Sequence, residues 1–220
     1  MKEKLKQFYE ASISYIKEAK MELIVLISLL ALDLISKAIV AGAMELGESV
    51  TLIPKFLHIT YSQNDAAAFG SAFGIDKLIG QKGALIFFMV LSIVAVCFFS
   101  YFLYKNKSGH KLIRVAYALI IAGAMGNLVD RVCYGYVRDF IEFEYLGLEI
   151  FGSTSFAIFN FADAALCIGV TIFAVFYIFI YKEPKKETKE TESETEAVVL
   201  DEAETAQEQP SVKEKDNADY

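Results

Sequence analysis

Two aspartates in the C-terminal half of the chain stand at opposite ends of one loop between the last two hydrophobic segments. Asp139 lies in Val137-Arg138-Asp139-Phe140, and Asp163 ends Phe159-Asn160-Phe161-Ala162-Asp163. A carboxylate at a membrane edge is costly unless it has a function or a partner. If the two segments pack together, the ionised member can take a proton from water while the protonated member polarises a carbonyl. That is aspartyl protease chemistry, although spacing alone also fits separate structural roles.

Further polar residues occur within the hydrophobic segments. Asp33 and Lys37 are four residues apart, so they share one helical face and can pair; the pair is either structural or in contact with a substrate. Asn127 and Arg131 have the same spacing and can hold an extended substrate through its backbone. For Asp130, between them, we favour a structural hydrogen-bond network.

Asn64 is followed by Asp65 and then by small residues, a pattern that suits a loop lying close to another backbone. Alone, this stretch is no stronger a signal than a turn. No metal-ligand spacing surrounds the cysteines or the histidines, so no metal or other cofactor is expected. These five residues are Cys97, Cys133, Cys167, His58 and His110.

The hydrophobic segments that would position these residues are long enough to cross a membrane. The chain is 55% hydrophobic with a mean hydropathy of +0.40, too apolar for an ordinary soluble domain of 220 residues. Four segments approach the roughly 20 helical residues that a bilayer requires. They lie near residues 21–42, 83–104, 112–131 and 158–181, which places Asp163 about five residues into the fourth span.

The termini are expected on the cytoplasmic side of a bacterial cell membrane. Residues 1–20 carry five lysines and apolar residues at helical spacing, typical of an amphipathic helix on the membrane face. Basic residues also fill the loop between the second and third spans, as the positive-inside rule requires. Residues 182–220 hold 13 acidic and 6 basic residues, a balance of −7 that equals the net charge of the whole chain, and they have too few apolar residues to fold, which predicts a disordered acidic tail.

The segments 43–82 and 132–157 then face outward. Residues 55–61, which follow Pro54, are aromatic and β-branched and are predicted to form a strand near the interface. Residues 143–155 are similar. The predicted fold is an all-α membrane protein of four transmembrane helices, spanning residues 21–181, with a small extracytoplasmic β-rich cap and an N-terminal amphipathic helix.

Taken together, these segments resemble lipoprotein signal peptidase, or signal peptidase II, a family of bacterial four-span aspartyl proteases. Five motifs occur in the family's order across residues 21–181, and together they are far more specific than any one alone. They are Asp33-Leu34-Ile35-Ser36-Lys37, residues 64–70, Gly126-Asn127-Leu128-Val129-Asp130-Arg131, Val137-Arg138-Asp139-Phe140, and Phe159-Asn160-Phe161-Ala162-Asp163 with Gly169.

The resemblance implies that Asp139 and Asp163 are the catalytic pair. It implies substrate-groove roles for six other residues: Asn64, Asn127, Arg131, Asn160, Asp33 and Lys37. The family cuts prolipoproteins just before the diacylglyceryl-modified cysteine, without metal or organic cofactor. The expected partners are these substrates, membrane lipids and globomycin-type inhibitors. No nucleic acid is expected, and the protein is expected to be a monomer.

The chain departs from the family pattern at three positions near the motifs. Asp65 and Ala66 stand where the family usually has a small or neutral residue and a glycine, and Ala122-Gly123 replaces a Gly-Gly pair. None of these changes touches the two aspartates. The alternative functions are a small transporter or proton-coupled channel that uses intramembrane Asp and Lys residues, and an inactive scaffold.

Overall fold

The computed structural model describes residues 18–65, 75–106, 109–150 and 152–181, and Glu3, Leu5, Lys6, Gln7, Tyr9, Ser14 and Ile16. The predicted helix over residues 1–20 lies largely outside the described residues, and the predicted tail from residue 182 lies entirely outside them. The elements that position the site are α2 (Lys20–Ala43), β1 (Ser49–Ile53), β2 (Leu57–Asn64), α4 (Ile75–Lys105), α5 (Lys111–Tyr134), β3 (Val137–Phe143) and α6 (Phe161–Val175), which continues into the π-helical turn η1 (Phe176–Ile180).

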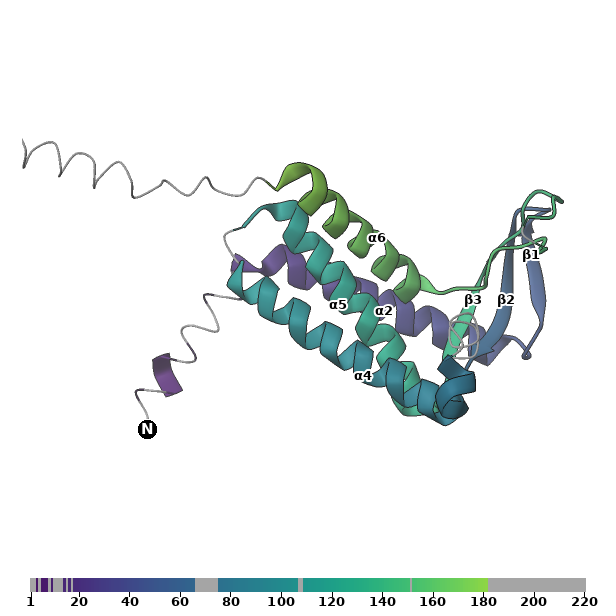
Figure 1. Cartoon of the computed structure of the whole chain (residues 1–220), viewed down its shortest axis with the longest axis horizontal. Helices are drawn as coiled ribbons and strands as arrows, with labels where there is room; N and C mark the ends of the chain where they lie inside the picture. The colour runs from purple at the N-terminus through teal and green to yellow at the C-terminus, as the bar shows by residue number, and fades with distance from the viewer. Residues whose placement is uncertain are drawn as a thin grey trace, which may run out of the picture. The chain divides into compact units, whose positions relative to one another are not determined.

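Four helices are long and apolar enough to cross a membrane, which confirms the predicted fold class. They run side by side, with a small sheet at one end of the bundle (Figure 1). The second helix begins at Ile75, but Gly80, with a φ of 72°, interrupts it, so the uninterrupted part begins close to the predicted residue 83. Its first residues include Lys77, Gln81 and Lys82, so hydropathy did not mark them as part of a span.

The fourth helix begins at Phe161, three residues later than predicted. Phe159 instead pairs with β3, because its backbone N–H donates to Ile141 O over 3.0 Å and its carbonyl accepts from Ile141 N over 2.8 Å. Asp163 therefore lies in the first turn of α6, where backbone N–H groups lack helical partners.

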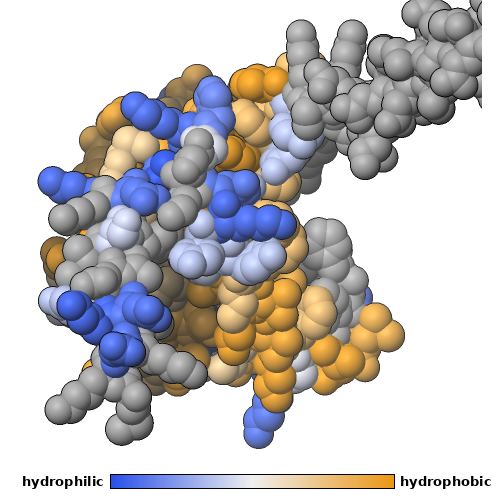
Figure 2. Space-filling model, turned by 90° about the vertical axis from the view of Figure 1, so that its left-hand side faces the viewer, coloured by the Kyte–Doolittle hydropathy of each residue, from blue (hydrophilic) through white to orange (hydrophobic). Residues whose placement is uncertain are grey.

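Helix α5 is the centre of the bundle and packs against α2, α4 and α6. Small residues allow this close approach: a Cβ atom on Gly123 would overlap the Ala162 carbonyl oxygen of α6. Toward the end far from the sheet, an aromatic and aliphatic cluster that includes Tyr117 and Phe176 fills the space between the helices. Hydrophilic residues gather on that far end, and hydrophobic residues cover the flanks (Figure 2).

The sheet has the antiparallel order β1-β2-β3. The predicted strand over residues 55–61 was wrong at its start, because Pro54, Lys55 and Phe56 form the turn between β1 and β2. The second predicted strand was also displaced. β3 covers Val137–Phe143, and within the described part of residues 144–155 only isolated bridges form. Asp139 is therefore held by a strand, which fixes the direction of its side chain.

Candidate active site

The structure brings Asp139 and Asp163 to the same residue, Asn160. Asp139 points from β3 and is 2% exposed, whereas Asp163 is partly exposed in the first turn of α6. Asn160 Nδ2 donates to Asp139 Oδ1 over 2.6 Å. Asn160 is also the N-cap of α6: its Oδ1 accepts from Asp163 N over 2.9 Å, and its own N–H donates to Asp163 Oδ2 over 3.1 Å. One residue thus binds both carboxylates.

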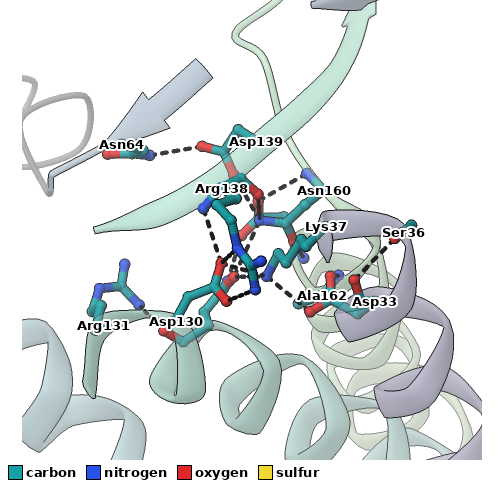
Figure 3. Close-up of polar contacts among 12 residues, drawn as sticks. Asp33, Ser36, Lys37, Asn64, Asp130, Arg131, Arg138, Asp139, Asn160 and Ala162 are labelled. Carbon is teal, nitrogen blue, oxygen red and sulfur yellow. Dashed lines mark hydrogen bonds and ion pairs between the residues drawn. The ribbon is translucent and has the colours of Figure 1, made fainter. Parts of the chain in front are cut away.

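Two further asparagines complete the contacts of the carboxylate pair (Asp139 and Asp163). Asn127 Nδ2 on α5 donates to Asp163 Oδ1 over 2.7 Å. Asn64 Nδ2 at the end of β2 donates to Asp139 Oδ2 over 3.1 Å (Figure 3). Each of the four carboxylate oxygens therefore accepts an N–H, so neither side chain is free to rotate.

The environments of the two carboxylates differ. Burial, together with the nearby Asp163 charge, raises the pKa of Asp139 to about 7, against the lowering effect of its hydrogen bonds and of the Lys37 charge. Asp163 lies at the N-terminus of α6, where the helix dipole favours a negative charge. Of the two acids, Asp139 is therefore the one whose surroundings favour the protonated form up to a pH of about 7.

A network of buried ions lies directly beneath the pair. Lys37 Nζ lies 2.8 Å from Asp33 Oδ2 and 3.6 Å from Asp130 Oδ2, and it donates to Asn127 Oδ1 over 3.0 Å. Arg138 binds Asp130 through its backbone N–H and its guanidinium, with the shortest contact at 2.6 Å. Both lysine and arginine are thus paired, as buried charges require.

Asp33 has a second contact that ties α2 to α6. Its Oδ1 accepts the backbone N–H of Ala162 over 2.9 Å, which satisfies another N–H group of the first turn of α6. Asp33 and Lys37 are 1% and 0% exposed. These contacts favour a structural role for Asp33 and Lys37 over substrate contact. They also show how Asp33, through Ala162, helps to position Asp163.

Arg131 lies at the rim of this network. Its guanidinium lies 5.5 Å from the centre of the Phe88 ring, and its Nη1 donates weakly to the Asn127 carbonyl over 3.4 Å. The charges of Asp163 and Asp139 both act on it. The guanidinium Nε is buried and has no hydrogen-bond partner among the described residues, so a donor remains beside the carboxylate pair.

All eight predicted site residues belong to this one region: Asp33, Lys37, Asn64, Asn127, Arg131, Asp139, Asn160 and Asp163. The rest of the Asn64 motif, residues 66–70, lies outside the described residues. Sequence reasoning missed the role of Arg138 as the partner of Asp130. It also missed the helix cap, although the Asn160-x-x-Asp163 spacing is that of a capping box.

Four apolar helices and a cluster of acids, amides and cations beneath a small sheet define a class, the polytopic membrane enzymes with a buried acid–base site. A family model described as Signal peptidase (SPase) II matches residues 25–179. The lipoprotein signal peptidase of Staphylococcus carnosus (strain TM300) is 38% identical over 163 residues, 74% of this chain and 93% of that protein. That of Listeria monocytogenes serotype 4b (strain CLIP80459) is 34% identical, over 71% and 92%.

Two solved structures, both described as bacterial membrane enzymes studied by the in meso method, share the fold. One, at 1.9 Å resolution, has a TM-score of 0.59 and 32% identity, over 74% of this chain and 95% of that chain. The other, at 2.3 Å, has a TM-score of 0.62 and 31% identity, over 76% and 95%. The chain belongs to the signal peptidase II family. It is therefore a protease of prolipoprotein processing, and the aspartyl type of its chemistry follows from the family, as the resemblance implied.

Proposed function

We propose that the protein cuts diacylglyceryl-modified prolipoproteins just before the lipidated cysteine, with Asp139 and Asp163 as the catalytic pair. The observation that carries this proposal is the shared contact of both carboxylates with Asn160, at the end of the bundle that bears the sheet. Asp139 is buried and Asp163 is partly exposed. Among the described residues of this region, no other two carboxylates that differ in this way accept hydrogen bonds from one residue.

The geometry supports a direct attack by water. Asp163, partly exposed and charged, takes a proton from a water molecule, whose oxygen attacks the scissile carbonyl carbon. Asp139 donates its proton to the carbonyl oxygen, which gives a neutral tetrahedral diol. The C–N bond then breaks as Asp163 gives its proton to the leaving nitrogen and Asp139 regains one from a diol hydroxyl. The pair returns to its starting state, and no covalent enzyme intermediate forms.

Arg131 and Asn64 would hold the substrate backbone beside the pair. Arg131 has a donor that no described residue uses, and Asn64 lies on the strand next to Asp139. Asn127, Asn160, Asp33 and Lys37 are 9% exposed or less, so their contribution to binding would be to hold the groove in shape.

The apolar flanks of the bundle would receive the lipid. The side chains of Ile86, Val90 and Val94 on α4 are more than half exposed, as on a surface that faces acyl chains. The substrate would enter laterally from the bilayer. Globomycin-type inhibitors would bind the same groove, and the active unit would be the monomer.

The active site would face the extracytoplasmic side. The end of the bundle opposite the sheet carries the exposed cations Lys20, Lys105 and Lys111, and the positive-inside rule assigns such an end to the cytoplasm (Figure 2). Both termini would then be cytoplasmic. A transporter is no longer a candidate, since the family is one of proteases.

The test is cleavage of a purified precursor in three forms: diacylglyceryl-modified, unmodified, and with serine in place of the lipobox cysteine. Mass spectrometry of the products identifies the cut. We expect a mature chain that begins with the lipidated cysteine from the first form and little or no product from the other two. Equal cleavage of all three forms, or a cut elsewhere, would contradict the proposal.

A further inference from the structure

The buried Lys37 ammonium is connected to Asp163 through a single amide group. Lys37 Nζ donates to Asn127 Oδ1 over 3.0 Å, and Asn127 Nδ2 donates to Asp163 Oδ1 over 2.7 Å. Asn160 Nδ2 also donates to Asn127 Oδ1, over 3.1 Å. Lys37 is 0% exposed, so no water competes for this contact.

The Lys37 contact, together with the Asn160 donation, fixes which way the Asn127 amide points. An ammonium group can only donate hydrogen bonds, so the oxygen of the amide must face Lys37 and its NH₂ group must face Asp163. The reverse orientation would set two donors against each other at about 3 Å in a buried site, at the cost of an unsatisfied polar group. The positive charge also polarises the amide and strengthens its N–H donation. A carboxylate that accepts such a bond is favoured in its ionised form.

The charges around Lys37 cancel one another, so the Lys37 charge does not have to neutralise the carboxylate pair. Asp33 and Asp130 carry two negative charges and Lys37 and Arg138 two positive charges, all within hydrogen-bonded or ion-pair contact. The carboxylate pair with one shared proton carries a single negative charge, opposite Arg131. The whole site is then neutral, which is the favoured state in a low-dielectric environment.

We propose that Lys37 is a positioning residue of the reaction, which holds the Asn127 amide with its NH₂ group toward Asp163 and so keeps Asp163 ionised as the base. The role rests on the proposed function of the carboxylate pair. It differs from substrate contact, because Lys37 reaches Asp163 through Asn127 and is shielded from any ligand. It also differs from a purely structural role, because it predicts an effect on the protonation of Asp163.

The test is the pH profile of kcat and KM for lipidated precursor. The main variant is the double substitution Asp33→Asn/Lys37→Met, which removes a positive and a negative charge together and keeps an acceptor for the Ala162 N–H. The acid limb, which is the fall of kcat toward low pH, should move to a pH about one unit higher. At a given pH on that limb, kcat should then be about tenfold lower than in the wild type. KM should stay close to the wild-type value, and the alkaline limb should move upward by less than the acid limb, because the variant also removes the Lys37 charge that lowers the pKa of Asp139.

A matched control exists at the other end of the same two helices. Glu22 and Arg114 form a buried ion pair between α2 and α5, with Arg114 Nε 2.9 Å from Glu22 Oε1. Glu22→Gln/Arg114→Met removes this pair at the cost of stability, but it should leave both limbs in place. Lys37→Arg, which keeps a charged donor, should also keep the acid limb near the wild-type position.

The path through Asn127 is tested by a mutant cycle. In an Asn127→Ala background, Asp33→Asn/Lys37→Met should produce no further movement of the acid limb, because the amide that transmits the effect is gone. Two results would overturn the positioning role alone. In the first, the acid limb stays in place in the folded Asp33→Asn/Lys37→Met variant. In the second, this double substitution moves the acid limb by the same amount in the Asn127→Ala background. A wild-type protein that does not cut the lipidated precursor overturns the proposed function and this role with it.

Discussion

At the scale of single residues, the site depends on amides that bind carboxylates. Asn160 contacts both members of the pair, Asn127 contacts Asp163, and Asn64 contacts Asp139. Amides donate without carrying charge, so they orient the carboxylates without fixing the shared proton as a lysine or arginine would. The two acids differ in burial: Asp139 is 2% exposed, which raises its pKa, whereas Asp163 is partly exposed.

The raised pKa of Asp139 predicts how activity depends on pH. Below its pKa of about 7, Asp139 keeps the proton that the carbonyl oxygen needs. Above that value both carboxylates are ionised and the pair lacks an acid. We therefore expect kcat/KM to fall as pH rises through about 7, as measured on lipidated precursor. A profile that stays flat up to pH 9 would show that Asp139 is not the acid.

Asn160 has two roles that substitution can separate. Asn160→Ser keeps an oxygen to cap α6 but removes the NH₂ group that donates to Asp139, so we expect activity to fall about 10- to 100-fold with little loss of stability. Asn160→Ala removes the cap as well and should cost a further ~0.5–2 kcal/mol. Thermal unfolding and cleavage kinetics of both variants measure the two effects. Unchanged activity in Asn160→Ser would remove Asn160 from the site.

At the scale of elements, the close packing of α5 and α6 sets the position of Asp163. Gly123 faces the first turns of α6, where a Cβ atom would lie 2.9 Å from Leu166 N and overlap the Ala162 carbonyl. Asp163 lies between these two residues in sequence. A displacement of α6 at this point therefore moves the carboxylate.

Gly123→Ala should destabilise the protein by ~1–3 kcal/mol, because the added methyl group meets backbone atoms that cannot move alone. It should also slow cleavage. Gly42→Ala on α2 is the control, since no atom lies within 4 Å of a Cβ there. Unfolding in detergent compares the two. Equal stabilities would mean that the contact between α5 and α6 adapts freely.

The elements also show what the sequence could predict and why the rest was hidden. The spans followed from hydropathy, since length and apolarity alone define a membrane helix. β1 was missed because all five of its residues are exposed, so it lacks the alternation that identifies a half-buried strand. The contact between Asp130 and Arg138 was missed because it depends on Gly135, whose φ of 81° ends α5 and turns the chain back.

At the scale of the whole molecule, the proposed active site and the exposed lysines lie at different ends of the bundle. The carboxylate pair and its ions lie beneath the sheet, and exposed lysines lie at the far end. The long apolar helices between them match the thickness of a bilayer. In the proposed function, the site would lie at the depth of the lipidated cysteine.

The tail contributes charge but no motif of the family, and the family match ends at residue 179. Deletion of residues 184–220 should therefore leave the turnover of lipidated precursor within about twofold of the full chain, since these residues lie beyond the family match and their composition has too few apolar residues for a core. Side-by-side kinetics in the same detergent provide the comparison. A large loss would assign the tail a part in catalysis.

The most direct test of the account is the cleavage rate of Asp139→Asn and Asp163→Asn on lipidated precursor, measured with the thermal stability of each variant. The amide keeps the shape of the carboxyl group and removes its acid–base function. We predict that each variant remains folded, with a Tm close to that of the wild type, and loses at least about 100-fold in kcat. A folded variant of either kind that cuts at the wild-type rate would contradict the assignment of the pair.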